Sequence, residues 1–294
     1  MATSATPEWD RWDLLASPMF ATLAPLIERL PDDHFPTLAE LNRLCAERDV
    51  VSGGGEPLEF VPQEGKTGEP YEKRVYAYGK VLTRDRNMHD LFNALVWLSF
   101  PKSKAAINRH HYREMQAREG GEARGPVRDA LTLFDESGVI VASVDPGLSA
   151  LLTGFQWKPL FWERRDEVLR GMRFHLFGHA LYEKALRPYK GITGKCVMLD
   201  VPARELELPL PQQLAALDTR LARMLADLRS LGTTEAYAPL PILGVPGWIP
   251  DNEYERYYDD TQQFRPGRRQ AEAAAETPPD RSTSATPKRK GRRK

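Results

Sequence analysis

Two successive helical segments, the first of them almost entirely apolar, constrain the fold of this chain more than any other feature. Residues 87–111 read NMHDLFNALVWLSFPKSKAAINRHH. Pro101 interrupts the helical pattern, because proline removes a backbone donor and clashes with the preceding turn. Apolar side chains such as Leu91, Leu95 and Leu98 recur around the first segment, which predicts a helix buried in a protein core. A chain of 294 residues is long enough to form such a core.

Helical and extended patterns are interspersed along the rest of the chain. Thr37 and Glu40 form a capping-box pattern at the start of one expected helix. Expected helices cover 35–48, 88–100, 103–118, 161–186 (one helix, or two joined near Gly171) and 211–231. Strands are expected at 58–63, 71–84 and 191–202, with a β-hairpin over 129–145 that turns at 135–138. Because no regular βαβ alternation occurs, we expect an α+β, helix-rich single domain with a β-hairpin and a few short strands, spanning residues 8–266.

Charge is distributed unevenly between the body of the chain and its end. Residues 267–294 carry nine Lys or Arg against three Asp or Glu, although the whole chain has 41 of each kind. This polar, basic segment and residues 1–7 are predicted to be disordered. The basic tail is expected either to contact nucleic acid or acidic surfaces weakly, or simply to aid solubility.

The sequence excludes several common function classes and predicts a cellular location. It contains no GxGxxG, GxxxxGK[ST] or GxSxG motif, which argues against a dinucleotide, P-loop or α/β-hydrolase site. No apolar run approaches the length of a membrane span, and the N-terminal residues lack the pattern of a signal peptide. We therefore expect a cytoplasmic protein in which Cys45 and Cys196 are reduced thiols.

Histidines and amides cluster in the two segments around Pro101. His89 and Asn93 lie four residues apart in the first expected helix. Lys104, Asn108 and His111 follow in the second at spacings that place them on one helical face. If the two helices fold against each other at Pro101, these faces can form one polar site.

A second histidine cluster lies in FHLFGHALYE. On a continuous helix, His175, His179 and Glu183 would form a stripe with two imidazoles one turn apart, which can bind a divalent metal such as zinc. The stripe lacks the HExxH arrangement, because its carboxylate does not lie between the histidines. Asp135 and Glu136 at the predicted hairpin turn are candidate bases or further ligands.

The same residues also have structural interpretations, which stay open at this point. Asn87 is expected to cap its helix, with Asp90 closing a capping-box-like arrangement. His89 alone is typical of a satisfied boundary histidine, and Lys104 of a solvated surface residue. Acidic residues such as Asp135 are common at turns without any chemical role.

Several blocks of the sequence resemble the bacterial domain-of-unknown-function family 3025. The blocks are YEKRVYAYGKVLTRDRNMHDLFNALVWLSFPKSKAAIN, RDALTLFDESG, FGHALYE and LPILGVPGWIPDNEYERYYDDTQQFRP. The resemblance covers roughly residues 8–268. The sequence departs from the family pattern at Met88, where an aromatic residue is expected. It implies a cytoplasmic bacterial protein with one domain, and it carries over no activity, cofactor or catalytic residue.

Three functions remain open from the residues alone. The first is a metal-assisted hydrolase, and the second is a metal-free small-ligand pocket or structural polar network. The third is a non-enzymatic interaction protein whose C-terminal Pro/aromatic segment and basic tail dock a partner or nucleic acid. The expected partner is a small molecule or a protein. For the hydrolase, the candidate metal ligands are His111, His175 and His179, with His89 as an alternative. The candidate catalytic residues are Asp135, Glu136 and Glu183. The candidate ligand-binding residues are His89, Asn93, Lys104, Asn108, Arg128 and Asp129.

Overall fold

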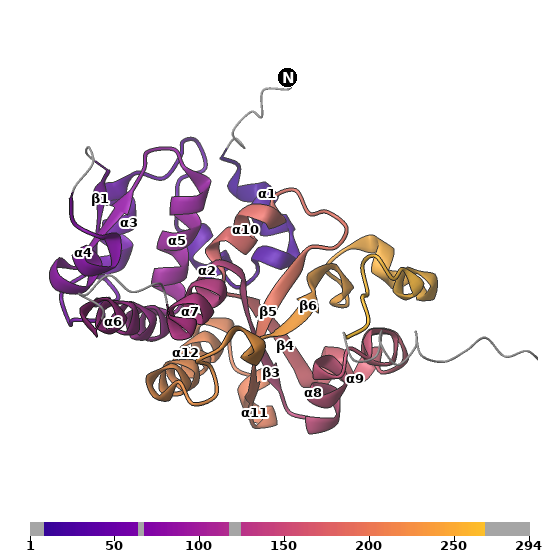
Figure 1. Ribbon diagram of the computed structural model, residues 1–294. Coiled ribbons are helices and arrows are strands. Elements are labelled where there is room, and N and C mark those ends of the chain that lie inside the picture. Colours follow the sequence, from indigo (N-terminus) through magenta and orange to yellow (C-terminus); the bar gives the residue numbers. More distant parts are fainter. Residues whose placement is uncertain (1–8, 64–67, 118–124, 268–294) are drawn as a thin grey trace, which may run out of the picture.

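The computed structural model describes residues 9–63, 68–117 and 125–267 (Figure 1). The predictions for residues 1–7 and for the basic tail after Gly267 lie outside these ranges, and the domain boundaries at 8 and 266 stay predictions. The α+β, helix-rich expectation is confirmed. One cluster of buried apolar side chains runs through the described residues from Trp9 to Phe264, so they share a single core.

Helices occur throughout the described chain, and α6 and α12 are the longest. The main helices are α1 (Arg11–Ala16), α2 (Ala24–Ile27), α3 (Leu38–Ala46), α4 (Tyr71–Tyr78), α5 (Met88–Ser99), α6 (Pro101–Ala117), α7 (Pro126–Ser137), α8 (Pro146–Thr153), α9 (Arg165–Gly171), α10 (His179–Ala185), α11 (Ala203–Leu206) and α12 (Leu210–Asp227). Strands are β1 (Glu59–Pro62), β2 (Lys80–Thr83), β3 (Gly138–Ser143), β4 (Met172–Leu176), β5 (Thr193–Asp200) and β6 (Ala238–Pro241).

A four-stranded mixed sheet forms the centre of the molecule. Its order is β4-β3-β5-β6, with β3 and β5 parallel and the two outer pairs antiparallel. All six residues of β3 are buried, as expected for a central strand covered on both faces. Helices α7 and α12 contact β5, while α8 contacts β3 and β6 (Figure 1). The parallel strands β1 and β2 form a separate small sheet near α3 and α4.

The helix pair around Pro101 is confirmed. Asn87 caps α5 by accepting a hydrogen bond from the Asp90 backbone N–H at 3.0 Å. Eight of the twelve residues of α5 are buried, which agrees with its apolar composition. Asp90 does not close a capping box. Its carboxylate instead accepts hydrogen bonds from the Arg84 backbone and guanidinium at 2.7–2.9 Å, which joins β2 to α5.

The predicted β-hairpin over 129–145 is wrong. Its first arm is helix α7, which begins with Pro126 at its first turn and continues to Ser137, and only its second arm is a strand, β3. Ala130, Leu131 and Phe134 are buried on one helical face, and this spacing outweighs the turn-like composition of residues 135–138. Asp135 and Glu136 therefore lie in the last helical turn.

The long helix expected over 161–186 is also wrong. A π-helical turn at Pro159–Glu163 and helix α9 are followed by strand β4 and then by α10. Met172, Phe174 and Leu176 alternate with Arg173 and His175 in β4, a period of two that is typical of a strand. The histidine stripe does not exist, because His175 lies in β4 and His179 is the first residue of α10.

Other expectations are confirmed in part. The capping box of Thr37 and Glu40 begins α3, and the strands at 58–63 and 191–202 are present. The segment 71–84 is half helix and half strand, because Gly79 ends α4 in the left-handed conformation (φ 66°). Helix α12 ends at Leu228, which itself adopts the left-handed conformation (φ 51°).

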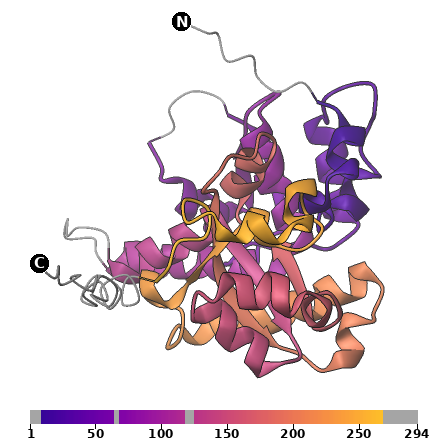
Figure 2. The ribbon, with the colours of Figure 1, turned by 90° about the vertical axis from the view of Figure 1, so that its right-hand side faces the viewer.

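The last described segment crosses one face of the molecule (Figure 2). The Trp157 indole donates a hydrogen bond to the Arg265 carbonyl at 2.8 Å, and the Gly191 N–H donates to the Gln263 side chain at 2.6 Å. These contacts attach the segment to α8–α9 and to the start of β5. Among the described helices, none combines the length and apolar character that crossing a bilayer requires.

Candidate functional site

Helices α5, α7 and α10 meet at a cluster of ionisable side chains (Figure 1). His89 of α5 bonds through Nδ1 to the Glu183 carboxylate of α10 at 2.9 Å. The His89 ring also packs edge-on against His179, with the ring centroids 4.6 Å apart at an interplanar angle of 82°. The fold therefore brings together three residues that were candidates from the sequence, His89, His179 and Glu183.

Gly178 allows α10 to begin beside the end of α7. A Cβ at this position would lie 2.5 Å from the Glu136 carbonyl oxygen, the Gly138 nitrogen and the Ser137 Cα. The N–H groups of Phe177 and Gly178 both donate to the Gly138 carbonyl at 2.9 Å. This close backbone approach places His179 next to Asp135 and Glu136. Gly178 was not among the residues predicted from the sequence, because the strand before it was predicted as helix; a glycine between a strand and a helix is the signal for such an approach.

Replacing Gly178 by alanine is expected to destabilise the fold by about 1–3 kcal/mol, because backbone atoms must move to admit the new methyl group. Urea unfolding followed by circular dichroism measures this loss. Gly68→Ala is the matched control, because a Cβ there meets no described atom within 4 Å. Equal midpoints for the two variants would contradict the packing described at Gly178.

His179 is a buried imidazole with unmet hydrogen-bonding capacity. Its side chain is 8% exposed, and its buried Nδ1 has no hydrogen-bond partner among the described residues. Nδ1 lies 3.7 Å from an Asp135 carboxylate oxygen, and Nε2 lies 3.9 Å from a Glu136 carboxylate oxygen. Burial lowers the pKa of His179 to about 4, despite the Asp135 charge that raises it. The ring is therefore neutral at pH 7 and keeps a lone pair that can coordinate a metal.

A buried ion pair holds Asp135 beside His179. Lys104 of α6 is 4% exposed and donates to Asp135 at 2.5 Å and to the Asn93 side-chain oxygen at 3.0 Å. Its ammonium also lies 5.4 Å from the Trp97 ring centroid. Burial alone would raise the pKa of Asp135, but the Lys104 charge reverses this and lowers it. Lys104 is thus a paired interior residue, which contradicts the solvated alternative.

The imidazole rings of His89 and His179 are oriented in the same way relative to a carboxylate. Each ring directs Nδ1 toward a carboxylate, Glu183 for His89 and Asp135 for His179, which leaves Nε2 as the free nitrogen. Carboxylates in this position orient metal-binding histidines and increase their basicity. One ligand atom each from His89, His179 and Glu136 lies within 4.8 Å of the others. Glu136 and Glu183 have side chains 43% and 49% exposed, so the cluster opens to solvent.

The remaining candidates of α6 lie near this cluster but have other contacts. Asn108 is buried and accepts from the Gly53 N–H at 3.1 Å, and it donates to the Glu72 carbonyl and carboxylate at 3.0 and 2.9 Å. It therefore joins α6 to α4 and the 52–56 turn. His111 is buried, and its Nδ1 has no partner among the described residues. Asn93 donates to the Tyr71 hydroxyl at 3.2 Å, a contact that the sequence analysis missed.

Arg128 and Asp129 lie in the first turn of α7. They precede Asp135 and Glu136 by seven residues, or two helical turns. Arg128 therefore shares a helical face with Asp135, and Asp129 with Glu136, and the members of each pair are about 10 Å apart along the helix axis. Arg128 is half-buried and Asp129 is exposed. Neither forms an ion pair with another described residue.

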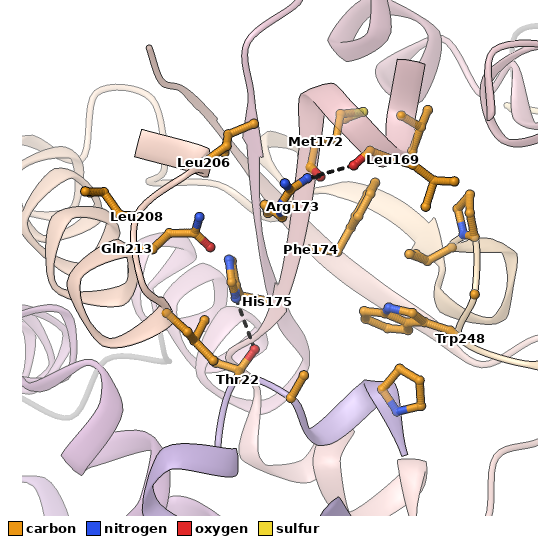
Figure 3. Close-up of a pocket in the computed structure, with 17 residues that line it drawn as sticks. Thr22, Leu169, Met172, Arg173, Phe174, His175, Leu206, Leu208, Gln213 and Trp248 are labelled. Atoms are coloured by element: carbon orange, nitrogen blue, oxygen red, sulfur yellow. Dashed lines mark hydrogen bonds between the residues drawn. The ribbon is translucent and has the colours of Figure 1, made fainter. Parts of the chain in front are cut away.

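His175 lies apart from the other site candidates. It is buried in β4, and its Nδ1 is 3.2 Å from the Thr22 hydroxyl. Figure 3 shows its ring in a separate cavity, near Gln213 and Arg173. The expected metal pair of His175 and His179 is therefore wrong, because a strand and a helix start replace the continuous helix that would have aligned the rings.

His175 is expected to stay neutral through the ordinary titration range of histidine. Burial lowers its pKa to about 4, whereas hydrogen bonding to Asp33 raises the pKa of exposed His34 above 6.5. The unfolded chain binds a proton at His175 before the folded chain does, so the free energy of unfolding falls as the pH drops from about 6.5 toward 4. Histidine NMR titration checks this. A His175 midpoint at or above that of His34 would contradict the burial argument.

Comparison with known proteins assigns the chain to a family. No curated protein and no solved structure matches the chain significantly. The profile of the family described as "Protein of unknown function (DUF3025)" matches residues 58–268, which include every residue of the cluster around His179. The match spans well over half of the chain and contains the blocks that first indicated the resemblance. The chain belongs to the DUF3025 family.

Proposed function

We propose that the chain binds one divalent cation of the zinc class through His89, His179 and Glu136, and uses it for hydrolysis. The observation that carries this proposal is the buried, neutral His179, whose nitrogens lie 3.7 and 3.9 Å from carboxylates without forming a normal hydrogen bond. Such an imidazole is destabilising unless another partner satisfies it. A cation shared with His89 and Glu136 supplies that partner for Nε2, and it favours the ring proton on Nδ1, beside Asp135.

The three ligand atoms require only a modest contraction to hold zinc. Zinc–ligand bonds of about 2.0–2.1 Å in a tetrahedron place neighbouring ligand atoms roughly 3.3 Å apart. The ligand atoms of His89, His179 and Glu136 lie within 4.8 Å of one another, so each separation has to shorten by about 1.5 Å at most. Glu136 is in the last turn of α7 and is 43% exposed, so rotation of its side chain accounts for most of the closure.

Three protein ligands leave a fourth position for water. Zinc in such a site lowers the pKa of bound water to about 7 and generates hydroxide at neutral pH. Glu183 accepts a hydrogen bond from His89 Nδ1, on the ring edge away from Nε2, so it orients His89 and the water proton passes to solvent. Asp135 orients His179 in the same way, and its charge is already paired with Lys104.

Arg128 is the cation that remains available for an anionic group of the substrate. It shares a face of α7 with Asp135 and has no ion-pair partner among the described residues. Lys104 is unsuited to that role, because it is buried and bonded to Asp135 and Asn93. The substrate in this proposal is a small, solvent-borne molecule that reaches the cluster past Glu136 and Glu183.

Zinc titration of chelator-treated, tag-free protein by calorimetry tests the proposal. One equivalent should bind, and the zinc-loaded protein should hydrolyse p-nitrophenyl acetate faster than the metal-free protein. Absence of stoichiometric binding of Zn²⁺ or Mn²⁺ would overturn it. Binding without any hydrolysis would leave a metal-binding protein and refute the hydrolytic part.

The second candidate function is a metal-free polar site in a protein that binds a small molecule or another protein. It is favoured by the bonds that already satisfy Lys104, Asn93 and His89 without any ion. Under this alternative, His179→Ala changes stability and leaves the affinity for zinc unchanged. A cytoplasmic location and weak contact of the basic tail with acidic partners remain part of the proposal in either form.

A further inference from the structure

A second polar site lies in a cavity that is lined in part by strand β4. The cavity has a volume of about 510 Å³, within the range of small-molecule sites. It is enclosed by α9 and β4, by the N-terminal residues around Thr22, by the start of α12 and by the loop ending at Trp248 (Figure 3). Its residues are separate from the cluster around His179.

The walls of this cavity are mainly apolar. Its larger apolar side chains are Leu169, Met172, Phe174, Leu206, Leu208, Leu210, Val245 and Trp248. Among the described residues, no Asp or Glu lines it, and Arg173 is the one lining side chain with a permanent charge. An apolar cavity with a single positive charge favours an apolar ligand that carries one negative charge.

His175 directs an unsatisfied nitrogen into this site. The residue is 5% exposed, and its buried Nε2 has no hydrogen-bond partner among the described residues. Its Nδ1 lies 3.2 Å from the Thr22 hydroxyl. If that hydroxyl donates to Nδ1, the ring proton is on Nε2, which then needs an acceptor.

The neighbouring Gln213 strengthens this assignment. Its amide nitrogen donates to the Glu205 carbonyl at 3.1 Å, which fixes the orientation of the amide. The amide oxygen is therefore left on the side of His175 (Figure 3). The nearby amide oxygen favours the tautomer with the ring proton on Nε2. Because no hydrogen bond forms between Nε2 and Gln213, the donor stays available to a ligand in the cavity.

Arg173 and His175 lie on the same face of β4, because side chains two residues apart in a strand point the same way. Arg173 Nη1 donates to the Leu169 and Met172 carbonyls at 2.9 and 2.8 Å, which anchors the guanidinium at the end of α9. Its Nη2 and Nε groups have no partner among the described residues. Two anchored donors thus lie side by side, about 7 Å apart at their backbones.

We propose that this cavity binds an apolar monocarboxylate. The carboxylate accepts hydrogen bonds from the Arg173 guanidinium and from His175 Nε2, while the apolar body lies against Leu206 and Leu208, on the same side of β4 (Figure 3). A guanidinium binds a carboxylate with two parallel donors, which gives both orientation and affinity. The site is independent of the metal cluster, so the two proposals can fail separately.

Calorimetric titration of the full chain with octanoate, in metal-free buffer, tests this proposal. Octanoate is expected to bind with one site per chain, and Arg173→Gln should weaken it at least about tenfold, the effect of losing a charge-assisted hydrogen bond. The matched alcohol 1-octanol should bind equally well to the parent and to Arg173→Gln. Arg170→Gln, an exposed arginine outside the cavity, is the control and should leave both affinities unchanged.

A second variant tests whether octanoate occupies this cavity, and it leaves Arg173 and His175 unchanged. Ala21 is exposed at the rim of the cavity, so Ala21→Trp should fill it and abolish binding of octanoate and octanol. No octanoate binding at about 1 mM would overturn the proposal. Binding that both Ala21→Trp and Arg173→Gln leave unchanged would also overturn it. Equal weakening of octanoate and octanol by Arg173→Gln would refute recognition of the carboxylate.

Discussion

Replacing His179 by alanine is expected to raise the Kd for Zn²⁺ by more than about 100-fold. Removing a residue that merely orients a ligand already weakens metal binding about 10–100-fold, and His179 is a ligand itself in this account. Its ring is buried and neutral, and its Nε2 faces Glu136 at 3.9 Å, so the substitution removes a nitrogen ligand from the cluster. Calorimetric titration with zinc measures the change.

His34→Ala is the matched control for adventitious surface binding. His34 is 47% exposed and lies 2.6 Å from Asp33 and 3.3 Å from Glu40, so it resembles a weak surface site. The Kd of this variant should equal that of the parent protein. A His179→Ala protein that binds zinc as tightly as the parent, while His34→Ala does not, would place the metal elsewhere.

Lys104→Met is expected to destabilise the protein by about 3 kcal/mol. Removing one partner of a buried ion pair costs about 3–5 kcal/mol, because the remaining charge has no counter-ion. The lower value applies here, because the Asp135 side chain is 20% exposed and water can reach it. Methionine fills the volume of the lysine stem, so the loss reports the charge. Guanidinium unfolding measures the change.

The double variant Lys104→Met/Asp135→Asn should recover much of that stability, because the unpaired charge is removed. Arg29→Met is the surface control. Arg29 and Glu47 form an ion pair in which both side chains are at least 40% exposed, and its loss should change stability by less than about 1 kcal/mol. A double variant no more stable than Lys104→Met would show that the charge on Asp135 is not the cause.

The helices around Pro101 could be predicted because every local signal agrees there. Asn87 caps α5, apolar residues surround it, and Pro101 begins α6. By contrast, the sequence of β4 predicts helix, because the apolar residues of 161–186 are dense enough to satisfy several periodicities. The alternation of Met172, Phe174 and Leu176 was the signal that distinguished the strand.

The site could be predicted in its residue types but not in its geometry. His89, Asp135 and His179 were each candidates, yet their proximity depends on tertiary contacts across about ninety residues. The stripe of His175 and His179 was a local inference, and it failed when the local structure changed at Gly178. For Lys104 the sequence left both a ligand-binding and a solvated role open, because burial of a lysine depends on its partner, Asp135, and sequence spacing does not reveal such a partner.

X-ray absorption at the zinc edge tests the central claim most directly. Tag-free protein loaded with one equivalent of zinc should show nitrogen and oxygen ligands at about 2.0–2.1 Å, with the outer-shell scattering of two imidazoles. The signal of those imidazoles should disappear in His89→Ala/His179→Ala. Protein that does not retain zinc through gel filtration, or a spectrum that the double variant leaves unchanged, would contradict a metal site at His89, His179 and Glu136.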